Sequence, residues 1–318
     1  MDEFKIIHKY FKKLSSNNSG AYGLTDDIFY DSKKKFAISV DTYVHKIHFL
    51  SLNPKNFVKK ILRSSLSDLY CKGIKPKLYF LSLVINKRTI SNGWLNNFKS
   101  VLSNEQKKFD ITLCGGDIVY GSNLVITFTV LGYSKKKPVL RSGSSLGDDI
   151  YVTGNIGDSY LGLNIIKKKF NFPKHNNFFK NCYYKPNLPV KIYPFLKKIA
   201  SSSIDVSDGL FQDLKHLCSK SKSGAFINLN YLPLSLPLKD LVNNNKIKVI
   251  NFFSKGDDYQ VLFTSNKKNR KKIRFISKKI KTKITRIGQI NNKKDIIISY
   301  NNKIFKTDPK KMGYTHSF

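Results

Sequence analysis

The sequence predicts a mixed α/β protein of two domains, and three observations support this fold class. The chain has 318 residues, more than the roughly 100–200 residues of a single domain. Apolar runs of strand length alternate with longer stretches of helical periodicity. Both halves share a plan of strand, acidic glycine turn and helix. We expect a boundary near residues 134–147, with domains of residues 1–137 and 138–318.

In the first half, helices and strands follow one another regularly. Apolar side chains at helical spacing predict an amphipathic helix over residues 3–14. Alternation over residues 36–42 predicts a strand with Asp41 near its C-terminal end. Asn53 and Pro54 start a helix that Gly73 ends. Further strands are expected at residues 78–85, 111–114 and 124–133, with a helix around residues 94–102.

The second half continues with the same kinds of segment. We expect helices after the strand at 150–154, from Leu210 onwards, and in the Lys-rich stretch 266–283. Residues 171–189 have no clear period and predict irregular structure, and residues 231–238 predict a proline-rich loop. The other strands are expected at residues 225–229, 260–264, 284–290 and 295–300.

The formal net charge of +36 raises the question of a nucleic-acid partner. Only six of the 57 basic residues are Arg, which base readers and phosphate clamps favour. The lysines are spread along the whole chain, and Asn and Ile are abundant too. We therefore interpret the charge as a solvated, Lys-rich surface and expect non-specific polyanion affinity but no specific nucleic-acid partner.

The sequence predicts a protein of the cytoplasm without membrane contact. It has no apolar run of 18 residues, and its N-terminus lacks the apolar core of a signal peptide. The four cysteines lie far apart in the sequence and form no CxxC pair. We expect reduced thiols, as is usual in a cytosolic protein.

Residues 203–214 form the stretch around which the chain is organised. Asp205 and Asp208 lie three residues apart, where a short apolar run gives way to a helical pattern. Two acids placed there repel each other unless a cation lies between them. The helix start also offers free backbone N–H groups that suit an anion. Together these features suit magnesium and a polyphosphate; the alternative is that Ser207 or Asp208 only caps the helix.

Other acids of this acid-poor chain also lie in or beside apolar runs, among Gly, Ser and Thr rather than Lys. Asp68 falls near a helix C-terminus, where a bound cation would explain it better than solvation alone. Gly115-Gly116-Asp117 could present N–H groups to a ligand, but a tight turn is the simpler reading. Arg141 could contact a phosphate or belong to a surface linker. His45 and His48 lack further zinc ligands.

Taken in order, several short motifs resemble those of the thiamine-monophosphate kinase family. This family shares an ATP-binding superfamily with aminoimidazole ribonucleotide synthetase and selenophosphate synthetase. The resemblance extends over essentially the whole chain. The segments that carry it are Thr25-Asp26-Asp27, Ser39 to Thr42 with His48-Phe49, Leu66 to Leu69, Gly115-Gly116-Asp117, Arg141-Ser142-Gly143, Val152-Thr153-Gly154 with Gly157-Asp158-Ser159, Ile204 to Leu210, Gly256 to Tyr259, and Gly313-Tyr314.

The resemblance implies transfer of the γ-phosphoryl group of ATP to thiamine monophosphate, in a homodimer built through N-terminal strands. No general base is implied, because the acceptor phosphate is already ionised. It implies several Mg²⁺ ions held at Asp27, Ser39, Val40, Asp41, Asp68, Asp117, Asp205 and Asp208. It implies nucleotide contacts at Gly116, Asp117, Arg141 and Ser207, and contacts to the thiamine phosphate at His48, Asp257 and Tyr314.

Three positions depart from the family pattern. Asp257 stands where Glu is usual, Val40 where Thr is usual, and Thr315 where Asp is usual.

Two other functions stay open. Another ATP-using enzyme of the superfamily is one alternative, although residues 15–25 lack the reactive Cys that selenophosphate synthetase needs. A basic nucleic-acid-binding protein is the other, but it leaves the clustered carboxylates unexplained.

Overall fold

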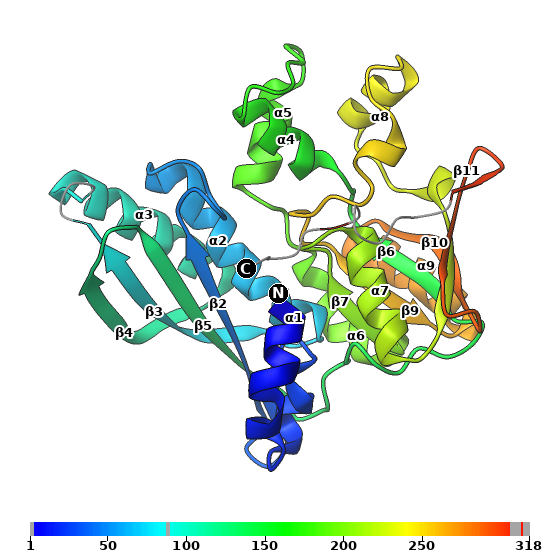
Figure 1. Cartoon of the computed structure of the whole chain (residues 1–318), viewed down its shortest axis with the longest axis horizontal. Coiled ribbons are helices and arrows are strands. Elements are labelled where there is room, and N and C mark those ends of the chain that lie inside the picture. Colours follow the sequence, from blue (N-terminus) through cyan, green and yellow to red (C-terminus); the bar gives the residue numbers. More distant parts are fainter. Residues whose placement is uncertain (1–2, 87–89, 306–312, 314–318) are drawn as a thin grey trace.

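The chain folds around two β-sheets that lie side by side, as a computed structural model shows (Figure 1). The structure describes residues 3–86, 90–305 and 313. Every described helix is too short or too polar to cross a lipid bilayer. The first sheet ends at Tyr133 and the second begins at Asp149. The division into domains of residues 1–137 and 138–318 stays a prediction.

The first sheet has the strand order β1-β2-β5-β3-β4, in which only β3 and β4 run parallel. Helices α2 and α3 cover one of its faces and bury Phe57, Leu62 and Phe98 against it (Figure 1). The opposite face stays open, with Val40 exposed to 60%. Its elements are β1 (Phe29–Asp31), β2 (Phe36–Val44), α2 (Pro54–Cys71), β3 (Pro76–Ile85), α3 (Asn92–Phe109), β4 (Thr112–Tyr120) and β5 (Val125–Tyr133).

The second sheet has the strand order β12-β11-β8-β10-β6-β9-β7. Helices α4, α7 and α8 enclose one core beside it, and α6 and α9 enclose another. The strands are β6 (Asp149–Thr153), β7 (Ser202–Asp205), β8 (Gly224–Asn228), β9 (Val261–Ser265), β10 (Ile284–Asn291), β11 (Ile296–Tyr300) and β12 (Lys303–Phe305). The helices are α4 (Asp158–Ile166), α5 (Asn176–Tyr184), α6 (Tyr193–Ile199), α7 (Leu210–Lys220), α8 (Leu236–Asn243) and α9 (Arg270–Ile280).

Helix α2 joins the two halves, because it contacts both the first sheet and strand β7 of the second. Its ends follow the sequence prediction. Asn53 caps its first turn and Pro54 occupies the first helical position. At the other end Gly73 has φ +71°, and the N–H groups of Gly73 and Ile74 bond the carbonyls of Tyr70 and Leu69. This αL residue follows the C-cap residue Lys72, so the end of α2 fixes where the Lys72 side chain starts.

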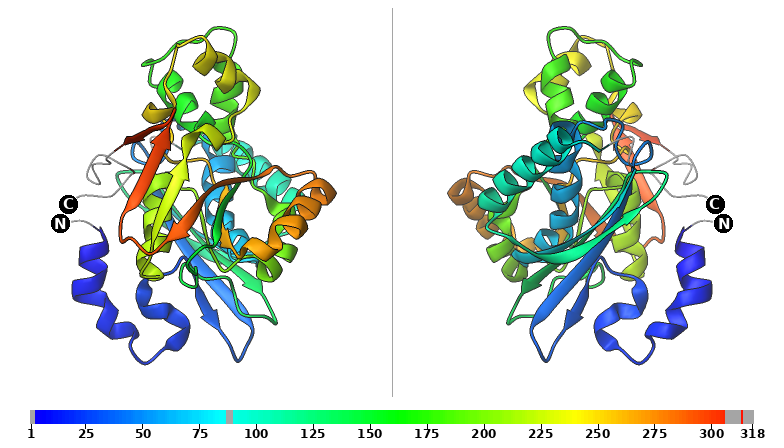
Figure 2. Two further views of the ribbon diagram at one scale, coloured as in Figure 1. Left: turned by 90° about the vertical axis from the view of Figure 1, so that its right-hand side faces the viewer. Right: turned by 90° about the vertical axis from the view of Figure 1, so that its left-hand side faces the viewer.

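The structure corrects four sequence predictions. Residues 3–14 do not form one regular helix: α1 (Glu3–Ile6) passes into a π-helical turn (7–11) and a 3₁₀ turn (12–15), and none of their side chains is buried (Figure 2). Residues 171–189 contain helix α5, and α8 begins inside the predicted loop 231–238. Gly115 and Gly116 lie within strand β4 rather than in a turn, because β4 pairs with β3 through them.

Candidate functional site

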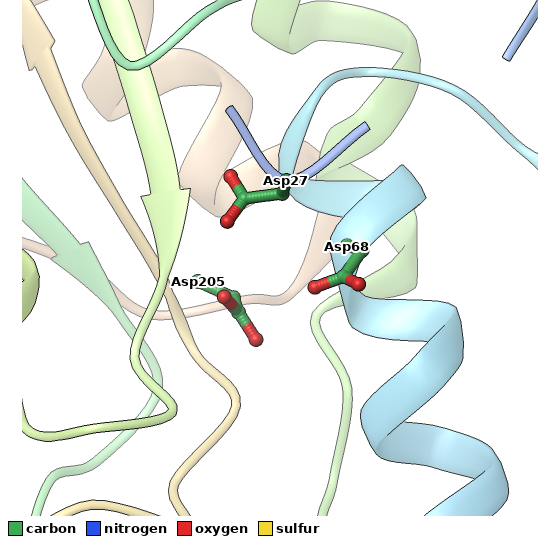
Figure 3. A group of neighbouring side chains, drawn as sticks. All are labelled: Asp27, Asp68 and Asp205. Carbon is green, nitrogen blue, oxygen red and sulfur yellow. The ribbon is translucent and has the colours of Figure 1, made fainter. Parts of the chain in front are cut away.

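Three carboxylates from distant parts of the chain meet at the joint between the two sheets. Asp27 precedes β1, Asp68 lies on α2, and Asp205 ends β7. One oxygen from each lies within 4.8 Å of the others, and the side chains point toward a common space (Figure 3). Hard oxygen ligands at such spacing suit Mg²⁺. The sequence brought all three forward as candidate metal ligands, and the structure places them together.

Hydroxyl groups fix the orientation of these carboxylates. Ser39 on β2 donates a hydrogen bond to Asp68. Ser67 on α2 donates to Asp205 across the joint, at 2.5 Å. Asp41, on the helix-covered face of β2, accepts from Tyr43 at 3.1 Å. These bonds orient the three acids.

The pKa values of the clustered acids reveal unbalanced negative charge. Burial, together with Asp41 and Asp205 nearby, raises the pKa of Asp68 well above its ordinary value. Burial and the neighbouring Asp27 raise the pKa of Asp205 to about 7. Burial also raises the pKa of Asp41. A buried carboxylate with no cation beside it is costly, so the site fits a divalent cation that would balance these charges.

Asp26 and Asp27 differ, because basic residues already balance their charge. Lys72 Nζ lies 2.9 Å from Asp26 Oδ1 and 2.6 Å from Asp27 Oδ2. Arg141 forms an ion pair with Asp27, and its backbone N–H donates to Asp26 at 2.8 Å. Burial alone would raise the pKa of Asp27, but Arg141 and Lys72 lower it below its usual range.

Sequence reasoning missed Lys72 altogether. In a chain with dozens of lysines, no local pattern marks one of them as buried. Its position one residue before the αL glycine of α2 was a usable signal, since it lies four residues after Asp68 and therefore on the same helix face. The structure also corrects one alternative for Arg141, because that side chain lies in the site rather than on a surface linker.

The loop after β7 carries Ser207 and Asp208 into the same region. Burial raises the pKa of Asp208 to about 7, and Arg141 acts in the opposite direction. The cap residue of α7 is Gly209, whose N–H bonds the side chain of Asp213 at 3.0 Å. Neither Ser207 nor Asp208 therefore caps the helix, and both side chains remain available for a ligand.

Residues 254–259 pack directly on this loop. The Asp257 N–H donates to the Ser207 carbonyl at 2.8 Å, and the Tyr259 N–H donates to that of Val206 at 2.8 Å. A Cβ atom added to Gly256 would collide with the Ser207 carbonyl oxygen. Asp257 itself has φ +71°, in the left-handed region. The two loops thus form one interlocked unit.

The Asp257 side chain is held by a buried lysine. Lys60 Nζ lies 2.5 Å from Asp257 Oδ1, and the Tyr259 hydroxyl donates to the same oxygen at 2.8 Å. The ammonium group also lies 4.7 Å from the centre of the Tyr183 ring. The Tyr183 hydroxyl reaches the carbonyl oxygen of His48 at 3.4 Å, so His48 adjoins this group of residues.

Not every candidate residue lies near the cluster. Asp117 on β4 is paired with Ser82 on β3, and it lies on the same face of the first sheet as Phe80. Asp41 lies on the opposite face, which α2 covers. Gly116 and Asp117 are exposed on edge strand β4. The Val40 side chain points to the open face as well, so only its backbone could serve the site. Tyr314 and Thr315 lie outside the described residues.

The chain is similar to proteins of known function. Residues 23–134 match the family model for the N-terminal domain of AIR synthase related proteins. A thiamine-monophosphate kinase of Buchnera aphidicola subsp. Acyrthosiphon pisum is 36% identical over 99% of this chain and 98% of its own length. One from Haemophilus influenzae is 31% identical over 92% and 90%.

A solved structure described as AaThiL complexed with AMPPCP and TMP has a TM-score of 0.84 to this chain. The two sequences are 26% identical, and the match covers 99% of this chain and 97% of that one. The mixed α/β fold class predicted from the sequence is therefore confirmed.

Proposed function

Because the chain belongs to the thiamine-monophosphate kinase family, we propose that it transfers the γ-phosphoryl group of ATP to thiamine monophosphate. The product is thiamine diphosphate. The observation that carries this proposal is the meeting of Asp27, Asp68 and Asp205 at the joint, where the charges of Asp68 and Asp205 are not balanced. The related structure described with AMPPCP and TMP supports both substrates.

We propose that Mg²⁺ ions bind between the two halves of the chain. Asp68 and Asp205 would hold them, together with Asp27, Asp41, Asp208 and the backbone near Ser39 and Val40. Bound there, Mg²⁺ would offset the repulsion between the two phosphate-bearing substrates and the charge that spreads over the transferring group. Two properties of the proposed ligands support this role. All of them are oxygen atoms, and their negative charge exceeds the positive charge of the nearby basic residues.

The chain needs no general base for this reaction, because the acceptor phosphate arrives ionised. Its residues instead bind and orient. His48 Nδ1 accepts the backbone N–H of Val44 at 3.0 Å, so the neutral imidazole carries its proton on Nε2. We propose that His48 contacts the acceptor. Asp257, held by Lys60, is the candidate contact for the thiamine moiety, with Tyr314 beyond the described residues.

Arg141 and Ser207 are the proposed nucleotide contacts. Arg141 uses Nε and one Nη to hold Asp27. Its planar fork has further N–H donors, which suit a phosphate oxygen. The Ser207 hydroxyl lies 3.5 Å from Asp205 Oδ1, between two proposed metal ligands, Asp205 at the end of β7 and Asp208 in the loop.

We further propose that two copies of the chain associate through the open face of the first sheet. Val40, Phe80 and Val119 expose 60%, 38% and 46% of their area on that face. Exposed apolar side chains on a flat sheet with an uncovered edge strand are typical of an interface. Asp117 lies on the same face, so we propose that Gly116 and Asp117 act on a nucleotide at the seam between subunits.

The dimer can be tested with Val40→Asp and Val119→Asp, measured by sedimentation velocity. Each introduces a charge into the proposed interface, so we expect a monomer. Leu236→Asp is the matched control, because Leu236 on α8 is 82% exposed and lies in the other half of the chain. A wild-type chain that is monomeric at micromolar concentration would contradict the proposal.

We expect the reaction to take place in the cytoplasm. All four cysteines are free thiols, and Cys114 is exposed. An exposed free thiol is typical of a reducing compartment.

The choice of acceptor tests the function most directly. The chain is incubated with ATP, Mg²⁺ and either thiamine monophosphate or free thiamine, and the products are separated by chromatography. We expect thiamine diphosphate from the first and no phosphorylation of the second, because a neutral hydroxyl would need a base to remove its proton. Equal or faster phosphorylation of free thiamine would show that the acceptor assignment is wrong.

A further inference from the structure

We propose that Lys72 serves as a permanent cation of the site and takes the place of one metal ion that Asp26 and Asp27 would otherwise bind. This inference rests on the proposed metal site and adds a residue to it. Lys72 is thus a positioning residue that fixes how many metal ions the site takes.

The surroundings of Lys72 resemble those of a coordinated ion. Its side chain is fully buried, at 0% exposure. Nζ contacts three oxygens: Asp26 Oδ1 at 2.9 Å, Asp27 Oδ2 at 2.6 Å and the Ser203 carbonyl at 2.7 Å. The Ser203 contact is a hydrogen bond, and the two carboxylate contacts are ion pairs. Two negative charges therefore lie beside the buried ammonium group and offset the cost of its burial.

The oxygens come from both sides of the joint. Asp26 and Asp27 belong to the segment before β1, and Ser203 belongs to β7, two residues before Asp205. Lys72 is also the C-cap residue of α2, where the helix dipole favours a positive charge. The two carboxylates, the Ser203 carbonyl and the helix C-terminus together hold the ammonium group in place.

Only two of the described lysines are buried, Lys72 and Lys60. Lys60 pairs with Asp257, outside the group of Asp27, Asp68 and Asp205. Lys72 instead binds Asp27, a member of that group, and so removes negative charge from the site itself. A lysine that only tied two segments together would leave the number of bound metal ions unchanged. That difference separates the two roles.

The test uses Lys72→Met and Lys72→Gln, which remove the charge but keep most of the side-chain length. Mg²⁺ binding to the chain without nucleotide is measured by isothermal titration calorimetry, and Tm is measured with and without Mg²⁺. We expect one more Mg²⁺ per chain than in the wild type. At about 100 times its Kd, the extra ion should add about 4 °C to the Tm gain from Mg²⁺.

Lys60→Met is the matched control, because it removes the other buried lysine and should leave the Mg²⁺ count unchanged. A Lys72 variant that folds only when Mg²⁺ is present supports the proposal. An unchanged Mg²⁺ count and Tm gain would overturn it, as would failure of both Lys72 variants to fold at any Mg²⁺ concentration. Failure of the chain to phosphorylate thiamine monophosphate would instead count against the proposed function, since the metal count needs no acceptor.

Discussion

Two groups of buried aspartates meet at the joint and differ in what balances their charge. Asp26 and Asp27 have Lys72 and Arg141 beside them, and the pKa of Asp27 falls below its usual range although burial opposes this. Asp68 and Asp205 have hydroxyl donors instead, and burial and neighbouring acids raise their pKa values. The first group stabilises the folded chain, while the second is held ready for a ligand.

This contrast shows why buried acids should not be treated as one class. An acid paired with a basic residue contributes to folding, and removing its partner is costly. An acid crowded by other acids destabilises the chain until a cation binds. Asp27 belongs to both groups, because it contacts Lys72 and Arg141 and also lies within reach of Asp68 and Asp205.

The largest expected effect comes from the unbalanced group. Asp68→Asn and Asp205→Asn should each lower turnover of ATP and thiamine monophosphate by about 10²–10³-fold, the scale of losing one electrostatic contact to a transition state. Both variants should unfold no more easily than the wild type without Mg²⁺, because each removes a repulsive charge. Initial rates and thermal melts measure the two quantities.

Asp110→Asn is the control for these variants, because Asp110 is a surface aspartate paired with Lys75 and Lys77. It should leave turnover unchanged. Near-normal turnover in both Asp68→Asn and Asp205→Asn would falsify the assignment of these acids to the reaction.

Asp158 sharpens the comparison, since it is buried, has no basic partner among the described residues and is not a proposed metal ligand. Burial raises its pKa from 3.8 to about 6, and only the Ser235 hydroxyl, 2.7 Å away, opposes this. The folded chain therefore binds a proton that the unfolded chain has lost between about pH 4 and 6, and stability falls as pH rises through that window. Asp158→Asn should remove the loss.

We expect Asp158→Asn to raise the free energy of unfolding above pH 6 by at most about 3 kcal/mol, since one pKa unit corresponds to about 1.4 kcal/mol. Below pH 4 the variant and the wild type should be equal. Urea unfolding at pH 4 and pH 7.5 measures both. A gain of the same size at both pH values would indicate better packing rather than removal of a charge.

A smaller effect is expected where a balanced pair faces the acceptor. Lys60→Met should raise the KM for thiamine monophosphate about tenfold, about 1.4 kcal/mol, because Asp257 loses the partner that orients it. The KM for ATP should stay the same. Steady-state kinetics with each substrate varied in turn measure the split; equal increases in both KM values would mean that the change spreads beyond the acceptor side.

Much of the frame was predictable from local sequence signals. The helix from Pro54 to Cys71 starts and ends as its cap residues predict. The strand-to-helix junction at Asp205 and Leu210 was predicted from an apolar run that gives way to helical spacing. The family resemblance also named Asp27, Asp68 and Asp205 as candidate metal ligands. No local sequence pattern predicts that these three residues meet in the fold.

The rest depended on contacts between distant segments. Gly115 and Gly116 suggest a turn locally, but pairing with β3 keeps them in a strand. Helix α5 has a buried face made only of Phe179 and Tyr183, too few residues for a clear period. Lys72 is chemically identical to dozens of solvated lysines, and only the fold places it between Asp26, Asp27 and Ser203.

The interlocked loops have a consequence for any attempt to redesign the chain. At Gly209 and Gly256 the backbones of the two loops pack so closely that no side chain would fit. The Asp257 N–H also donates a hydrogen bond to the Ser207 carbonyl. A mutation that reshapes the acceptor side at 254–259 therefore displaces Ser207 and Asp208 as well. A search for variants that accept a new substrate would have to vary both loops together. A single substitution in one loop would change the acceptor contacts and the position of Ser207 and Asp208 at the same time.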